Sequence, residues 1–396
     1  MLNENTVKEL SKKLNEPEWL LNKRISAFSS FKALEMPSFK YGIGIFVDVS
    51  ELNLDQTTPL NEINTFEIIN NDEVEVLTFK EALKKHQDLI KKHFLSFIFP
   101  YENKLTALHA AFFNNALLVI IPEGKALSKP VQINLNLVAK TQLDHILVIA
   151  KENSKATVIE YSSSNLNNGQ VFRSHIVEAI VEENAYLEYI TIQNFSKSVY
   201  NFSKRRSKVD KNGFMYWIDA SIGSKFTQAL TSTNLHGHGA GSKNWGVIYG
   251  DENQCYDLNA ETIHAASETT CDMLTRVVLN DKAKTVYRGL VKINPKAVNC
   301  QGYQKDDTIL LSDDARADVV PNLEIANNDV KCSHGATISQ IDEDKLFYMT
   351  SRGLDEKTAK KTIVEGFFDP VIVKIQDERI RNEIISSISK RIGSLH

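Results

Sequence analysis

This sequence has few cysteines, no long hydrophobic run and a nearly equal number of positive and negative charges. Its 396 residues include four cysteines, none in a CxxC pair, which excludes a disulfide framework and predicts reduced thiols. The longest local apolar run, Ala116 to Ile121, is far shorter than the roughly 20 residues that span a bilayer. Lys and Arg total 46 against 50 Asp and Glu, a net charge of -4, so no basic face for nucleic acid is indicated.

Targeting and nucleotide-binding signals are also missing. The segment from Met1 to Glu9 lacks the basic-then-apolar order of a signal peptide, so we expect a cytoplasmic protein without a membrane contact. The glycines between Tyr41 and Val47 do not form a GxGxxG that opens a helix, and no Walker lysine motif is present. We therefore expect neither a dinucleotide nor ATP to be bound by this chain itself.

Helix signals are confined to the two ends of the chain. Apolar residues recur at helical spacing from Thr6 to Leu14, a second helix is predicted to begin near Pro17, and Thr78 can cap a third that runs to about Phe94. These signals predict a mainly helical N-terminal region over residues 1–104.

The C-terminal region, residues 338–396, changes from a period of two to a period of about four. Asp342 and Asp355 are suited to be N-caps, and Gly353 and then Asp369-Pro370 are expected to end the two helices that follow them. A last helix carries isoleucines at steps of four, which the end of the neighbouring domain or a partner must cover. They are Ile384, Ile388 and Ile392.

Residues 105–337 between these regions are rich in short strand-like segments, which begin with two strands joined at Asn114-Asn115. Three segments share a turn residue, a small residue and an alternating stretch. Their small residues at 156, 185 and 213 are 29 (185 minus 156) and 28 (213 minus 185) apart, and later copies at 283 and 315 are 32 (315 minus 283) apart. Such a period, with turns too tight for crossover helices, predicts a β-solenoid. A β-sandwich of similar strand count is the alternative.

Several pairs in this middle region resemble metal ligands. His236 and His238 lie two apart and would share a strand face, but the surrounding glycines favour a turn. Zinc sites usually need three or four ligands. Glu261 with His264, and Cys271 with Asp272, are interpreted as outward polar residues, and the strand cysteines as small buried groups.

Two C-terminal stretches closely resemble the signature of the SufB/SufD family of iron-sulfur cluster assembly proteins, and within it SufD. They are Lys331 to Thr337, which reads KCSHGAT, and Ile341 to Leu354. Weaker matches elsewhere extend the resemblance over nearly the whole length of the chain. These are Glu16 to Trp19, Lys23-Arg24, Met36-Pro37, Ala107 to Gly124 and Lys129-Pro130.

This resemblance implies a mostly β protein, a right-handed parallel β-helix flanked by N- and C-terminal helical segments. It also implies a non-enzymatic subunit of a scaffold complex, which pairs with a SufB-type subunit and docks the SufC-type ABC ATPase through its C-terminal helices. The complex receives sulfur from a cysteine desulfurase and builds a transient iron-sulfur cluster at the subunit interface.

The resemblance also implies site residues. His334 matches the SufD-type histidine proposed as a cluster ligand at the interface with SufB, and Cys332, two residues before it, would share its strand face. Imidazole and thiolate both bind iron. Alternatively, Cys332 is merely buried and His334 only seals the interface. The ATPase-docking positions implied around the C-terminal helices are Phe347, Arg352, Gly353, Ile363 and Phe367.

Departures from the SufB pattern favour the partner role. The stretch from Tyr303 to Thr308 has an aspartate where SufB-type chains place a sulfur-accepting cysteine, and Cys332 to Gly335 replaces a Glu-His-Glu. Two alternatives stay open: a SufB-like chain that builds clusters as a homodimer, and a β-helical enzyme that acts on polysaccharides. Carboxylate pairs such as Asp313 with Asp314 suit the latter, although turn positions explain them better.

Overall fold

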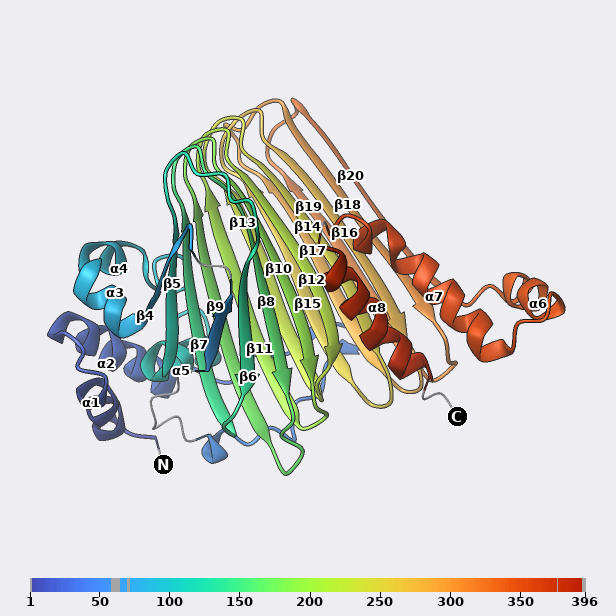
Figure 1. Cartoon of the computed structure of the whole chain (residues 1–396), viewed down its shortest axis with the longest axis horizontal. Helices are drawn as coiled ribbons and strands as arrows, with labels where there is room; N and C mark the ends of the chain where they lie inside the picture. The colour runs from blue at the N-terminus through green and yellow to red at the C-terminus, as the bar shows by residue number, and fades with distance from the viewer. Residues whose placement is uncertain (1, 58–64, 70–71, 376, 394–396) are drawn as a thin grey trace.

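The computed structural model describes residues 2–57, 65–69, 72–375 and 377–393. Its body is a long coil of strands, with helices at the N-terminal end and along one side (Figure 1). Successive strands alternate between two nine-stranded sheets, which we call the even sheet (β20-β18-β16-β14-β12-β10-β8-β6-β3) and the odd sheet (β19-β17-β15-β13-β11-β9-β7-β5-β4). Each coil therefore adds one strand to each sheet.

The strands of the even sheet in chain order are β3 (Phe66–Ile69), β6 (Val131–Leu137), β8 (Lys155–Ser164), β10 (Tyr186–Phe195), β12 (Phe214–Gly223), β14 (Gly241–Gly250), β16 (Thr270–Leu279), β18 (Cys300–Leu310) and β20 (Val330–Gln340). Those of the odd sheet are β4 (Glu75–Thr78), β5 (Asn115–Ile121), β7 (Thr141–Ala150), β9 (Val171–Val181), β11 (Val199–Val209), β13 (Phe226–Leu235), β15 (Cys255–His264), β17 (Lys284–Ile293) and β19 (Arg316–Ile325). From β5 onward neighbours are parallel, while β3 and β4 are antiparallel to β6 and β5. The predicted mostly β solenoid with helical ends is thus confirmed.

The register between coils shows where the predicted repeat was right and where it was wrong. Tyr186 lies opposite Phe214, a step of 28 (214 minus 186) as predicted. It lies opposite Lys155 on the other side, a step of 31 (186 minus 155) rather than 29. The sequence comparison matched Ala156 with Ala185, but Ala156 lies three residues after the corner residue Asn153, whereas Ala185 directly follows Asn184. It took no account of the longer loop between β8 and β9.

The turns before these strands use the residue type that their backbone needs. Asn153, Asn184 and Asn212 all have positive φ, at 58°, 56° and 52°. Asparagine tolerates this left-handed conformation better than other non-glycine residues. These asparagines therefore mark the corners at which three successive coils enter the even sheet, whereas Gly239 and Glu268 have positive φ at the corners before β14 and β16.

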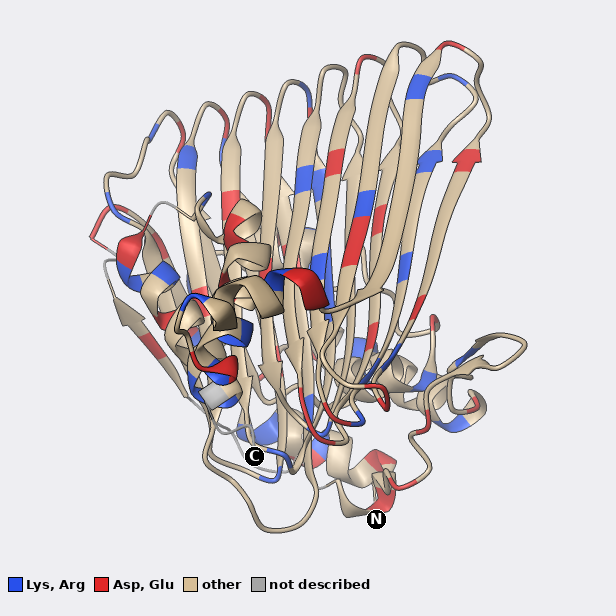
Figure 2. Cartoon of the chain, turned by 90° about the vertical axis from the view of Figure 1, so that its right-hand side faces the viewer, with Lys and Arg blue, Asp and Glu red and all other residues tan. Residues whose placement is uncertain are grey.

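The inside of the coil, which we call the lumen, holds the main apolar core, with inward side chains from both sheets. N-terminal helices cover the outer face of the odd sheet: α1 (Glu4–Lys13), α2 (Glu18–Ala33), α3 (Phe79–Lys85), α4 (Gln87–His93) and α5 (Lys104–Phe112). A short hairpin, β1 (Lys40–Gly42) and β2 (Ile45–Phe46), and the 3-10 helix η1 (Leu54–Gln56) follow α2. Lys and Arg alternate with Asp and Glu over the ribbon in Figure 2.

Two predictions in the N-terminal part were wrong. Residues 104–112 form helix α5 rather than a strand, and Asn103 accepts a hydrogen bond from the N–H of Thr106 at its start. Every residue from Leu105 to Phe112 is buried, so the segment lacks the polar face by which a helix is recognised. The helix predicted from Thr78 to about Phe94 is two helices, because His86 has a non-helical backbone.

The C-terminal helices are α6 (Glu343–Ser351), α7 (Glu356–Ile372) and α8 (Glu378–Gly393), and Asp342 and Asp355 cap the first two as predicted. Helix α7 continues through Pro370 instead of ending there. Pro370 lies in the last turn and Gly366, four residues earlier, is exposed, so its carbonyl group can be hydrated. Strand β20 extends three residues beyond 337, to Gln340.

The buried isoleucines of α8 pack with α7 against the outer face of the even sheet, whereas α6 projects away from the coil (Figure 1). The last helix is therefore covered within the chain, but along the side of the solenoid rather than at its last coil. No helix of the described ranges is long and apolar enough to cross a membrane.

Candidate functional site

The last coil leaves the lumen open at one end. Strands β19 and β20 are the final strands of the two sheets. In β20, Cys332 pairs in register with Gly302 of β18, and His334 pairs with Gln304. Parallel neighbours in register point to the same side of a sheet, and Gly302 and Gln304 are buried inside the coil. Both sequence-predicted residues therefore face the lumen at its open end, where Cys332 is half-buried and His334 is exposed.

A column of thiol groups lies beneath Cys332. Gly302 separates Cys332 from Cys271 of β16, the next strand inward. A methyl group at Gly302 would lie 3.2 Å from Cys332 Sγ and 3.4 Å from Cys271 Sγ. Because glycine has no side chain, both sulfur atoms lean toward the same position on the inner wall.

Cys271 is linked to a buried imidazole and through it to a third thiol. His264 Nε2 lies 3.2 Å from Cys271 Sγ, and His264 Nδ1 lies 2.7 Å from Thr269 Oγ1. The same Thr269 oxygen lies 3.2 Å from Cys300 Sγ. The prediction that His264 and Cys271 point outward was wrong. Glu261 and His264 are three residues apart, and Cys271 and Asp272 are adjacent. Because side chains alternate along a strand, the two members of each pair point to opposite faces of the sheet.

Burial sets the protonation of these groups. It raises the pKa of the Cys271 thiol to about 12 and lowers the pKa of His264 to about 4. Burial likewise raises the pKa of Cys332. At neutral pH the thiols of Cys271 and Cys332 are protonated and the imidazole of His264 is neutral. A metal would displace protons from the thiols on binding.

Within the described part of the chain, no group of three or more His, Cys, Asp or Glu side chains is arranged to hold a metal ion. His236 and His238 lie in the turn between β13 and β14, as their glycines predicted, and His238 Nε2 is 3.6 Å from a carboxylate oxygen of Glu268. Asp313 and Asp314 also lie in a turn, between β18 and β19.

A shallow pocket of about 650 Å³ opens beside the thiol column, at the start of the last even strands. Its wall includes Cys271, Gly302 and Cys332 together with outward residues of the same strands. The two flanking thiols therefore line a hollow that is reached from the surface near the open end.

The residues predicted to dock an ATPase are not all on one surface. Phe347 of α6 is 75% exposed and Tyr348 beside it is 59% exposed. Arg352 lies over the Tyr348 ring at 5.3 Å, and Gly353 ends the helix with a φ of 97°. Ile363 and Phe367 are instead half-buried.

In helix α7 the apolar residues Ala359, Ile363 and Phe367 recur every four positions, but only Ala359 of the three belongs to the buried face. Its buried residues are Ala359, Val364, Phe368, Val371 and Ile372. Phe367 lies under the guanidinium group of Arg276 on β16, at 4.8 Å. Of the predicted docking residues, those on and after α6 are therefore the most accessible.

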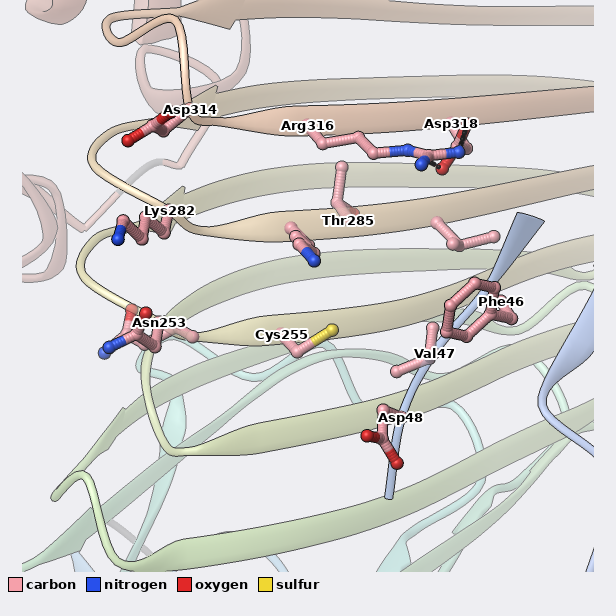
Figure 3. A pocket seen from close by; sticks show the side chains of 13 residues that line it. Phe46, Val47, Asp48, Asn253, Cys255, Lys282, Thr285, Asp314, Arg316 and Asp318 are labelled. Atoms are coloured by element: carbon pink, nitrogen blue, oxygen red, sulfur yellow. Dashed lines mark hydrogen bonds and ion pairs between the residues drawn. The ribbon is translucent and has the colours of Figure 1, made fainter. Parts of the chain in front are cut away.

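A second hollow, of about 440 Å³, lies between the β1–β2 hairpin and the outer face of the odd sheet (Figure 3). Phe46 and Asp48 border it on one side and Cys255, Lys282 and Arg316 on the other. Burial raises the pKa of Cys255 to about 12, so this thiol is protonated and unreactive at neutral pH.

The hairpin beside this hollow is held by a cluster that sequence reasoning missed. Tyr41 Oη donates a hydrogen bond of 2.5 Å to Asp257, and Arg288 pairs with Asp257 at 2.9 Å while lying 3.9 Å from the Tyr41 ring. Tyr41 and Asp257 are 216 residues apart, and no local spacing connects them.

Comparisons with known proteins agree with this architecture. Residues 133–367 match the family model described as SUF system FeS cluster assembly, SufBD core domain, and residues 46–133 match the SufBD protein N-terminal region. Iron-sulfur cluster assembly SufBD family proteins of Staphylococcus haemolyticus and Staphylococcus saprophyticus are each 29% identical, over 93% of this chain and 88% of the relative. A protein of the same description from Staphylococcus aureus has the same identity and coverage. The core model alone covers more than half of the chain, which therefore belongs to the SufBD family of iron-sulfur cluster assembly proteins.

Proposed function

We propose that this chain is a SufD-like, non-enzymatic subunit that pairs in the cytoplasm with a SufB-type subunit and docks a SufC-type ABC ATPase. It contributes His334 and Cys332 to a cluster-assembly site at the subunit interface. The observation that carries this proposal is the open last coil, which presents an imidazole and a thiol on one inward face.

The ends of the two sheets support pairing with a second coil. Strands β19 and β20 have a strand partner on one side only, so a row of backbone N–H and C=O groups is available for another chain. Ile325 and Ile338 on these strands are 43% and 45% exposed. A second solenoid end presents the same two sheets and would extend both.

The ligand count supports an interfacial site. A cluster is usually held by four protein ligands, and the described residues offer no group of three. His334 and Cys332 can supply part of the set. The remaining ligands then come from the partner, and the iron and sulfur of the cluster are cargo rather than a resident cofactor.

Helix α6 supports docking of a further protein. Phe347 and Tyr348 are large apolar or aromatic side chains exposed on a helix that projects from the solenoid. Monomeric proteins rarely leave such side chains together at the surface without a binding role. An ATPase bound here would act on the complex without contacting the lumen.

The experiment is affinity capture of the tagged chain after co-expression with a SufB-type chain and a SufC-type ATPase. Retention of both supports the proposal, whereas retention of neither contradicts it. A variant with Phe347→Asp separates the two contacts, because it should lose the ATPase and keep the SufB-type chain.

A homodimeric SufB-like scaffold is the second candidate function. The column of Cys271, Cys300 and Cys332 favours it, since these thiols belong to the chain itself. Anaerobic reconstitution of the purified chain alone decides between the two. A cluster that forms on the chain alone and is lost with Cys332→Ser supports the homodimer, and its absence supports the SufD-like role.

A further inference from the structure

The hydrogen bonding of the buried polar side chains differs between the N-terminal and the C-terminal half of the lumen. In the N-terminal half its buried charges are paired within the chain. Arg173 Nε lies 3.0 Å from Asp144, and Glu160 accepts hydrogen bonds from Arg173 and from the Tyr189 hydroxyl, at 3.2 and 2.8 Å. His175 Nε2 is 2.9 Å from the same carboxylate. One polar atom of this network, His175 Nδ1, has no hydrogen-bond partner among the described residues.

The C-terminal half contains buried polar atoms that form no hydrogen bond with the part of the chain that the structure describes. The side chain of Gln304 is fully buried, and neither its oxygen nor its nitrogen has a hydrogen-bond partner among the described residues. The same holds for Asp306 Oδ2, the Tyr287 hydroxyl and Asn244 Nδ2, all on inward positions. Asp306 does bond to Thr308 through its other oxygen, at 3.2 Å.

The space around these atoms is shaped by small residues. A methyl group at Gly289 would lie 1.8 Å from Gln304 Nε2, so this glycine makes room for the amide. A cavity of about 30 Å³ lies farther inward, and Asn244, Thr275 and Tyr287 line it together with the Arg205–Asp219 pair. Tyr287 belongs to both the cavity and the unpaired cluster.

Buried polar groups without partners carry the full cost of removal from water, and folded proteins satisfy nearly all of them with protein groups or ordered water. The partner here must both donate and accept, because Gln304 offers an amide nitrogen and an amide oxygen. The cavity that Tyr287 lines has room for about one or two water molecules, so a partner there must be small.

We propose that the lumen between Asn244 and Asp306 is a binding site for ordered water, which bridges Gln304, Asp306 and Tyr287 and ends beneath His334 at the open end. The inference stands apart from the proposed function, because it rests on unpaired atoms of the coil and not on any partner.

The test counts long-lived internal waters in the purified chain by oxygen-17 magnetic relaxation dispersion. The variant Gln304→Met keeps the length of the side chain and removes both polar atoms. It should lose about one or two long-lived waters relative to the unmodified chain. An unchanged water count in a folded Gln304→Met chain overturns the proposal.

Gln193→Met is the matched control. Gln193 is also a buried lumen residue, but its nitrogen donates to Thr227 at 2.9 Å and its oxygen accepts from Asn201 at 2.8 Å. This variant should keep the water count. Should Gln304→Met fail to fold, a high-resolution crystal structure of the unmodified chain decides. Ordered solvent within hydrogen-bond distance of Gln304 and Asp306 supports the site, and an empty space overturns it.

Discussion

Cys271 and Cys332 approach one point on the inner wall of the solenoid from two strands that are not neighbours. The strand between them carries Gly302, and a methyl group there would contact both sulfur atoms, at 3.4 and 3.2 Å. The half-buried thiol of Cys332 at the open end and the buried thiol of Cys271, two coils deeper, therefore line the same stretch of the wall. Gly302, which has no side chain, therefore determines how closely the two sulfur atoms can approach each other.

Gly302→Ala is expected to destabilise the last coils. Its Cβ would lie 2.9 Å from Val291 Cγ1 as well as against both sulfurs, and overpacking of this kind typically costs about 1–3 kcal/mol. Denaturant unfolding measures the change. Gly335→Ala on β20, where a Cβ would meet nothing within 4 Å, is the control and should leave the free energy of unfolding nearly unchanged. Equal stabilities of the two variants would refute the packing argument.

Glu16→Gln should loosen the N-terminal helices. Glu16 and Arg24 form a two-point ion pair at 2.6 and 2.7 Å, both side chains are 0% exposed, and Arg24 also donates to the carbonyls of Ala111 and Phe113. Removing the carboxylate leaves a buried cation, which costs about 3–5 kcal/mol. Glu4→Gln, which breaks the half-exposed pair with Lys8, should leave the melting temperature unchanged. A similar melting temperature for both variants contradicts this account.

Asp306→Asn should stabilise the protein in a pH-dependent manner. Burial raises the pKa of Asp306 from 3.8 to about 7. Between these values the folded state holds a proton that the unfolded state has lost, so stability falls as pH rises from about 4 to 7. At pH 8 the variant should be more stable by up to about 4 kcal/mol, at roughly 1.4 kcal/mol per pKa unit.

The gain from Asp306→Asn should become small near pH 4, where the carboxyl of the unfolded state also takes up its proton. Unfolding curves at pH 4 and pH 8 measure the difference. Asp314→Asn in an exposed turn is the control and should show no such dependence. A gain of equal size at both pH values would show that burial of the charge is not its cause.

His334→Ala should reduce the yield of cluster on the proposed complex while the chain folds normally. An exposed residue on the last strand supports little packing, whereas loss of a ligand or orienting group weakens metal binding by about tenfold or more. The absorbance of anaerobically reconstituted complex reports the yield. Ser333→Ala, the exposed neighbour that points to the other side of the strand, is the control. An unchanged yield would leave His334 with a structural role only.

Much of the fold was predictable because its determinants are local. The turn asparagines, the caps Thr78, Asp342 and Asp355, and the isoleucine spacing of α8 act within a few residues of their own position. From these local signals the strands, the turns between strands and the starts of three helices could be predicted. The resemblance of residues 331–337 to a known signature then located the last strand, which no spacing argument would have singled out.

What the sequence did not predict depends on register or on complete burial. Helix α5 is buried on all sides, so its pattern does not distinguish it from a buried strand. The inward positions of His264 and Cys271 follow from the register of β15 and β16 with their neighbours. The contact between Tyr41 and Asp257 joins distant segments. Each of these features depends on which segments lie side by side in the fold. The alternation of apolar and polar residues along the sequence does not contain that information.

In the proposed complex, a partner coil binds the open end of the solenoid. Ile338→Asp places a charge on an exposed apolar position of β20, and Val138→Asp makes the same change at a 61% exposed residue between β6 and β7. Affinity capture of the SufB-type chain by each variant shows whether this end of the solenoid is the contact surface. The account predicts that Ile338→Asp loses the SufB-type chain while Val138→Asp retains it, and retention by both would contradict it.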